Sequence, residues 1–93
     1  MMFKASLREP IRQGEITTTI RVWQSARVKV GGTYKLAPGQ VVVVSVREID
    51  INDITPAMAR ESGFAGVIDL LKTARHGAGQ RVFFIRFRYE ETF

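Results

Sequence analysis

Hydrophobic and polar residues alternate along two segments of the chain, 15–23 and 81–89. The first is rich in β-branched residues, and one of its faces carries Ile16, Ile20 and Val22. Its opposite face carries Glu15, Thr17, Thr19, Arg21 and Trp23. In the second segment, one face carries Phe83, Ile85, Phe87 and Tyr89. A period of two and β-branched or aromatic residues are typical of strands, so both segments are predicted as strands with one face in the core.

Further extended segments are predicted between and before these two. Residues 28–36 surround a glycine turn at Gly31 and Gly32, and residues 37–40 form a second turn. Residues 41–46 are apolar at nearly every position, which predicts a strand buried on both sides. Residues 3–6 are expected to form a short first strand.

Helices are indicated by their start and stop residues. A helical turn over 7–13 ends at Gly14, the residue type that most easily adopts the left-handed conformation after a helix. Thr55 is a good N-cap and Pro56 suits the first helical position of a helix that runs to Gly63. A following helix, ended by the turn at 76–79, carries at helical spacing Val67, Ile68, Leu71 and Ala74.

These elements predict one domain over residues 1–93, because no linker, repeat or low-complexity stretch divides the chain. The expected fold is mainly β with two short helices, in the α+β class. A small β-barrel of about five or six strands fits this order, since closure removes exposed sheet edges.

Composition narrows the possible partners. The chain has 14 Lys and Arg against 9 Asp and Glu, a formal charge of +5, which favours an anionic partner such as nucleic acid. The absence of cysteine excludes disulfides and thiolate metal sites, and one histidine cannot furnish a histidine-rich metal cage. No apolar run approaches the ~20 residues that span a bilayer. We therefore expect a cytoplasmic protein with no membrane partner, metal or cofactor; its oligomeric state stays open.

Three segments resemble a known family. Residues 11–21, IRQGEITTTIR, are similar to the opening motif I-x-x-G-x-K-T-x-T-x-R of ASCH domains, relatives of the PUA domain. Residues 57–64 resemble the family's A-x-x-x-G-F segment at a helix junction, and residues 82–89 its closing strand. The resemblance implies a PUA-like β-barrel with a cleft beside the helices. It also implies RNA binding or, in some branches, hydrolysis of nucleic acid or modified nucleosides.

One departure from the motif bears on catalysis. The hydrolase branch has a lysine where this chain has Ile16, and its threonine is matched by Thr19. The branch's helical glutamate aligns with Ser62, one residue after Glu61. Because isoleucine can act neither as a base nor as a charge stabiliser, the sequence favours a non-enzymatic, RNA-binding module.

The polar face of the strand predicted at 15–23 is the leading candidate site. Its hydroxyls and Arg21 can bind phosphate or base edges, although threonine also simply favours strands and Arg21 can instead pair with Glu15 or Glu61. Trp23 is either a stacking platform for a base or a core residue. We expect Arg12, Arg21 and Arg60 to cluster across the cleft. The predicted nucleic-acid-binding residues are Arg12, Thr17, Thr19, Arg21, Trp23, Arg27, Lys29 and Arg60.

Two other functions remain open from the residues. A hydrolase acting on RNA or a modified nucleoside would use Thr19 as nucleophile or positioner, Glu61 as acid and base, and Arg21 as oxyanion stabiliser. A protein-interaction barrel would use an exposed aromatic patch, and its binding would be insensitive to salt.

Overall fold

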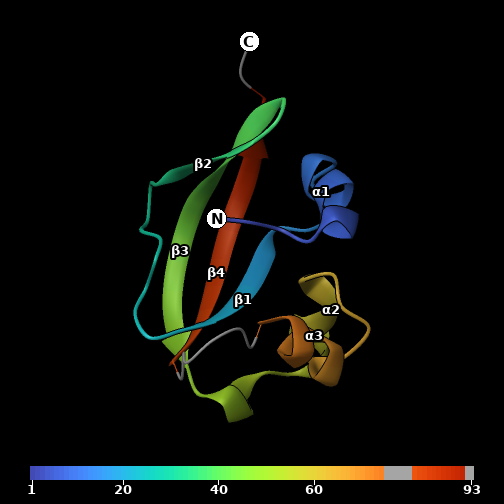
Figure 1. Ribbon diagram of the computed structural model, residues 1–93, viewed down its shortest axis with the longest axis vertical. Coiled ribbons are helices and arrows are strands. Elements are labelled where there is room, and N and C mark those ends of the chain that lie inside the picture. Colours follow the sequence, from blue (N-terminus) through green and yellow to red (C-terminus); the bar gives the residue numbers. More distant parts are fainter. Residues whose placement is uncertain (75–80, 92–93) are drawn as a thin grey trace.

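The protein is a small α+β fold in which four antiparallel strands form a curled half-barrel (Figure 1). The computed structural model describes residues 1–74 and 81–91. The strands lie in the order β1-β4-β3-β2, fewer than the five or six expected. The elements are α1 (Ala5–Arg12), β1 (Thr18–Trp23), β2 (Thr33–Leu36), β3 (Gly39–Ile49), the 3-10 helix η1 (Ile51–Asp53), α2 (Pro56–Glu61), α3 (Val67–Ala74) and β4 (Arg81–Glu90).

The predicted helix boundaries are largely confirmed. Gly14 follows α1 with a φ of 77°, and Gly63 follows α2 with a φ of 93°. The Thr55 hydroxyl accepts a hydrogen bond of 3.1 Å from the backbone N–H of Met58, as its N-cap role requires. The expected first strand is wrong, because α1 already begins at Ala5. The turn predicted at 76–79 lies outside the described residues.

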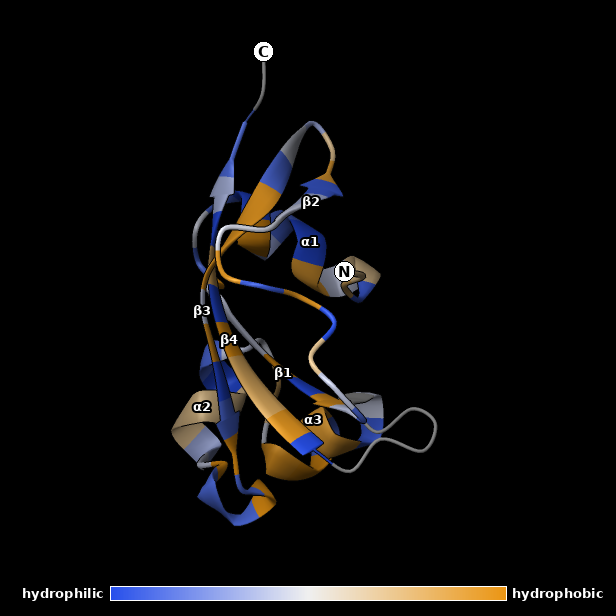
Figure 2. Ribbon diagram, turned by 90° about the vertical axis from the view of Figure 1, so that its left-hand side faces the viewer, coloured by the Kyte–Doolittle hydropathy of each residue, from blue (hydrophilic) through white to orange (hydrophobic). Residues whose placement is uncertain are grey.

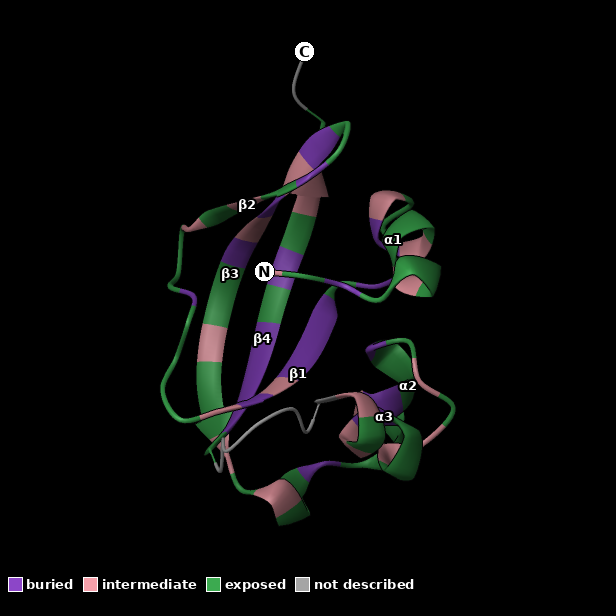
Figure 3. Cartoon of the chain, in the orientation of Figure 1, coloured by how far each residue is buried: buried purple, intermediate pink, exposed green. Residues whose placement is uncertain are grey.

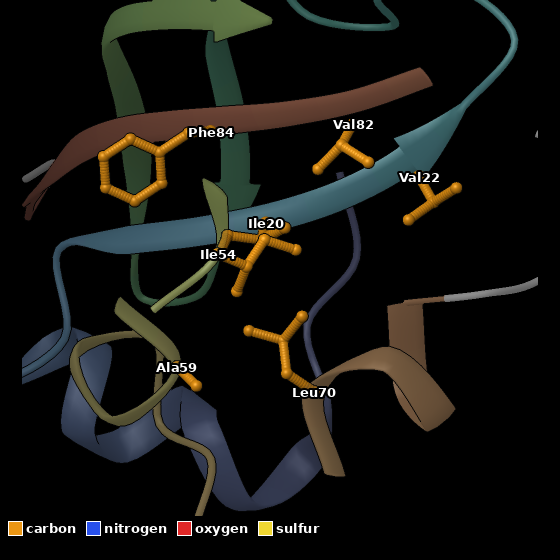
Figure 4. Close-up of a cluster of buried hydrophobic side chains, with 7 residues drawn as sticks. All are labelled: Ile20, Val22, Ile54, Ala59, Leu70, Val82 and Phe84. Carbon is orange, nitrogen blue, oxygen red and sulfur yellow. The ribbon is translucent and has the colours of Figure 1, made fainter. Parts of the chain in front are cut away.

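β4 is a central strand of the sheet and is buried on both faces from Val82 to Ile85. It pairs with β1 on one side and with β3 on the other. Val82 and Phe84 pack with β1 residues against the helical segments, as Figure 4 shows, in a cluster that also contains Ile20, Val22, Ile54, Ala59 and Leu70. This side is called the α2 face below.

The opposite side of the sheet, called the α1 face, carries the remaining core. Phe83, Ile85 and Phe87 are buried there, which confirms the predicted core face of this strand. Phe87 contacts Phe3, with ring centroids 5.4 Å apart, and Ile11 of α1 is completely buried in the same cluster. Figure 2 shows α1 and the N-terminal residues on one side of the sheet and α2 on the other.

β3 is buried on one side only, contrary to the prediction for 41–46. Val41 and Val43 are 0% and 1% exposed, whereas Val44 is 47% exposed. A β-bulge between Val43 and Ser45 shifts the register at this point. The α2-face core reaches β3 only near the end of the strand, at Ile49. On that face the middle of β3 is therefore exposed to solvent (Figure 3).

The buried stripe of α3 also differs from the prediction. Leu70 is completely buried in the α2-face core, while Ile68 is 70% exposed. Val67 and Leu71 pack against the edge of the same core. α3 contacts β1, and this contact determines which apolar residues of the helix are covered.

Candidate functional site

Two arginines hold consecutive carbonyl groups of the N-terminal segment Met1–Phe3. Arg21 on β1 donates from Nη2 to the Met2 carbonyl oxygen at 2.5 Å. Arg8 on α1 donates from Nε to the Phe3 carbonyl oxygen at 3.2 Å. The segment thus lies on the α1 face of the sheet (Figure 2), held by one arginine from β1 and one from α1.

Arg21 is half-buried among neutral partners. Its Nε donates to the Thr19 hydroxyl at 3.1 Å, and its guanidinium lies 5.1 Å from the centroid of the Phe3 ring. Among the described residues no carboxylate lies within the 4.0 Å of an ion pair, so the expected alternative pairing with Glu15 or Glu61 does not form.

Burial lowers the pKa of the Arg21 guanidinium, although arginine stays charged at neutral pH. Neutral acceptors compensate a half-buried cation less well than an anion does. The site around Arg21 therefore favours a negatively charged group.

Within the described part of the chain, three cavities border the N-terminal segment. The smallest, about 50 Å³, lies between β1 and the helices and is lined by Thr19, Arg21, Phe64 and Thr73 together with residues 2–4 and others. A second, about 320 Å³, lies on the α1 side, and a third, about 270 Å³, lies beside Trp23. Met2 lines all three, so this segment separates one from another.

The lining of these cavities is cationic. Their charged residues are Lys4, Arg8, Arg12, Arg21, Arg27 and Lys35, with no aspartate or glutamate. By contrast, a cavity of about 570 Å³ near the start of α2 is lined by Arg47 and by the carboxylates Glu48, Asp50 and Asp53. Arg12 forms an ion pair with Glu9 at 3.0 Å, so the positive charge along Met1–Phe3 comes mainly from the other five lining cations, which attract anions to this site.

Trp23 packs partly on the core and partly borders a cavity. Its ring packs on Phe83 with centroids 5.9 Å apart and an interplanar angle of 39°, so one part belongs to the core. The half-buried side chain also lines the 270 Å³ cavity, and the Arg27 guanidinium lies 5.9 Å from its ring. Arg21 and Arg27 line this cavity together with Trp23.

The threonines of the predicted site separate into different environments. Thr19 is 8% exposed and faces Arg21, while Thr17 is exposed and its carbonyl accepts from the Phe87 N–H at 2.9 Å. Thr18, on the other side of β1, bonds the Ser62 hydroxyl at 3.0 Å. Its place on the face of Ile20 and Val22 was the signal for this contact, because a buried hydroxyl needs a partner.

The expected cluster of Arg12, Arg21 and Arg60 is only partly assembled. Arg12 and Arg21 line cavities that share Met2 and Phe3. Arg60 is exposed on α2 and lines none of these three cavities, because α2 buries Ala59 on the opposite face of the sheet. Lys29 is also exposed and outside them.

The candidate hydrolytic residues are not assembled in the same way. Thr19 and Arg21 are hydrogen-bonded to each other. Glu61 is exposed, and it neither lines the cavity of Thr19 nor bonds Thr19 or Arg21 among the described residues. An acid and base at Glu61 would therefore have to act without direct contact with these two groups.

Sequence reasoning missed three of the lining cations, Lys4, Arg8 and Lys35. A signal existed for one of them, since Arg8 and Arg12 are four residues apart and such residues share a helix face. The position of Met1–Phe3 had no comparable signal, because it depends on contacts with a strand far along the chain.

Neither a known protein family, nor a curated protein, nor a solved structure matches this chain. Within residues 1–74 and 81–91, no group of three metal-ligating side chains could hold a metal ion. In the same residues, no helix combines the length and apolar character needed to cross a membrane.

Proposed function

We propose that the protein is an RNA-binding module that holds a single strand on the α1 face of its sheet. The observation that carries this proposal is the set of cations, the half-buried Arg21 among them, that line the three cavities beside Met1–Phe3, with no carboxylate among the lining residues. Guanidinium groups bind phosphate bidentately, as they also bind carboxylates. A nucleic-acid strand presents phosphates in series, which suits cations spread along a segment.

An aromatic side chain in the same place supports a nucleic acid over a simple anion. Trp23 borders the 270 Å³ cavity together with Arg21 and Arg27. Unpaired bases stack on aromatic rings, and each such contact contributes about 1 to 3 kcal/mol. Single-stranded RNA offers both the phosphates and the accessible bases that this pairing of residues recognises.

We also propose that the chain is a distant ASCH-type, PUA-like domain. The Thr18 and Ser62 hydroxyls join the motif at 11–21 to the helix junction at 57–64. Phe64 of that junction lines a cavity together with Thr19 and Arg21. A cleft between the first motif strand and the helices is what the resemblance implies, and these contacts support it.

The proposal predicts that binding depends on Arg21 far more than on a comparable arginine elsewhere. Arg88 is a suitable control, since it is exposed, lies on β4 and pairs with Glu90 at 2.7 Å. In fluorescence anisotropy with a labelled single-stranded RNA, Arg21→Gln should weaken binding by about 1.5 to 3 kcal/mol, the range for a hydrogen bond to a charged group. Arg88→Gln should change it little.

Salt provides the second test. Because each neutralised phosphate releases counterions, the affinity of the unmodified chain should fall steeply as salt rises, and Arg21→Gln should reduce that slope. Equal losses in the Arg21 and Arg88 variants would leave only diffuse electrostatic attraction. Binding that is insensitive to salt would favour a protein partner instead.

A further inference from the structure

We propose that residues Met1 and Met2 occupy the path of the bound strand, and that the strand displaces them so that a phosphate replaces the Met2 carbonyl on Arg21. This inference rests on the proposed function and specifies how the same site opens. Its starting point is the pair of bonds from Arg21 and Arg8 to consecutive carbonyl oxygens. Carbonyl oxygens accept from guanidinium N–H groups as phosphate oxygens do, but without their negative charge.

The two N-terminal residues separate the larger cavities. Met1 and Met2 line both the 320 Å³ cavity on the α1 side and the 270 Å³ cavity beside Trp23. Moving them away joins the two cavities into one groove. Its walls then carry Arg8, Arg12 and Lys35 at one end and Arg21 and Arg27 at the other.

A groove with cations at both ends fits a chain of phosphates better than one isolated phosphate. A single mononucleotide could engage either end, whereas a strand of several nucleotides engages both at once. The inferred ligand is therefore an extended single strand, whose backbone follows the line that residues 1–2 now take. A duplex keeps its bases paired and presents no base to Trp23.

The packing of the segment permits movement of its first residues only. Met2 is 80% exposed, so its displacement removes little apolar contact. Met1 packs against the edges of two core clusters, and the bound strand must replace these contacts. Phe3 is 7% exposed and lies against Phe87, so it stays in place. The Phe3 ring remains under the Arg21 guanidinium, which keeps that group oriented toward the vacated position.

The test uses the full chain, its only tryptophan and two variants. Trp23 emission is titrated with hexauridylate, with uridine monophosphate and with a uridine-free RNA duplex, at one fixed salt concentration. Hexauridylate should change the emission because Met1 and Met2 leave the cavity that Trp23 lines. The mononucleotide and the duplex should bind more weakly.

The variants separate the backbone from the side chain. A chain that begins at Phe3 lacks the competing carbonyl and should bind hexauridylate several-fold more tightly. Met2→Ala keeps the carbonyl that accepts from Arg21 and removes only a mostly exposed side chain, so it should gain clearly less affinity than the shortened chain. Thermal unfolding confirms that each variant is folded.

The outcomes distinguish this inference from the proposed function. If RNA binds with the expected dependence on Arg21 and salt, but the shortened chain binds no more tightly, the displacement is wrong and the proposed function stands. If the shortened chain does not fold, an unchanged Trp23 emission in the full chain overturns the displacement on its own. If no single strand binds any variant, the proposed function itself is wrong.

Discussion

A single buried hydrogen bond, between the hydroxyls of Thr18 and Ser62, joins β1 to the end of α2. The two oxygens are 3.0 Å apart, and both residues are almost completely buried. Among the described residues, no buried side-chain nitrogen or oxygen lacks a hydrogen-bond partner. The bond therefore satisfies two polar groups that would otherwise destabilise the contact between the sheet and the helical segment.

Removing both of these hydroxyls should cost less than the sum of the two single removals. Ser62→Ala leaves the Thr18 hydroxyl buried without this partner, so we expect the free energy of unfolding to fall by about 1 to 3 kcal/mol. Thr18→Val alone should have a similar effect. The double variant should lose clearly less than the sum, because neither side then carries an unsatisfied group. Urea unfolding measures all three, and strictly additive losses would contradict a direct interaction.

At the scale of elements, the turn after α2 depends on Gly63. Its φ of 93° is one that L side chains rarely adopt. A Cβ at this position would lie 2.5 Å from Leu7 Cδ2 and 2.8 Å from Ile16 Cδ1. The glycine thus allows the helix junction to approach α1 and the segment that leads into β1.

Gly63→Ala should therefore lower the free energy of unfolding by about 1 kcal/mol or more, through backbone strain and close contact. Gly66 is the matched control, since a Cβ there meets nothing within 4 Å and its φ is outside the left-handed range. Gly66→Ala should stay within about 0.5 kcal/mol of the original chain. Similar losses in both variants, measured by urea unfolding, would show that neither contact nor φ distinguishes the two positions.

The elements that the sequence predicted well are those marked by local signals. Thr55 and Gly63 mark the two ends of α2, and the alternation of residues identified the buried face of β4. Both signals act within a few residues of the chain. The faces of β3 and α3 depend instead on what covers them. Val44 and Ile68 belong to apolar runs, yet no core reaches them, and only the tertiary arrangement decides this.

The site was predictable to the same extent. The sequence placed Arg21 and Trp23 on one strand face because they stand at alternate positions, and the two residues line one cavity. Arg60 was misplaced, since sequence does not reveal which face of the sheet a helix will cover. The carbonyl groups that bind Arg21 and Arg8 belong to the backbone, for which composition and motifs carry no signal.

For the molecule as a whole, exposed ion pairs make stability depend on pH. Glu48 receives two hydrogen bonds from Arg81, at 2.7 and 3.0 Å, and these bonds lower the pKa of its carboxyl group below the ordinary value of 4.5. The pKa values of Glu9 and Glu90 are also lowered. The largest cause is a hydrogen bond from Gln13 for Glu9 and a hydrogen bond from Gln40 for Glu90.

The direction of the pH effect follows from the lowered pKa. At acidic pH the Glu48 carboxyl group binds a proton more readily in the unfolded chain than in the folded chain. The contribution of the Glu48–Arg81 pair to the free energy of unfolding is therefore fully present above pH 4.5, and it is lost as the pH falls through the folded pKa. Glu48→Gln should reduce this acid-induced loss of stability, measured as the shift in the urea midpoint. The effect should be small and should weaken with salt, because the pair is exposed. Glu15→Gln, at an exposed residue with no ion pair among those described, should leave the loss unchanged.

The place of β4 between β1 and β3 also has a consequence for biosynthesis. When the ribosome has made the chain only as far as α3, β2 and β3 can already pair with each other, but β1 has no neighbouring strand. The apolar residues of β1 and the helices therefore stay exposed until β4 has emerged and pairs with β1 and β3. We expect nascent chains that stop before Arg81 to be bound by chaperones or degraded, and those that include Glu90 to escape both.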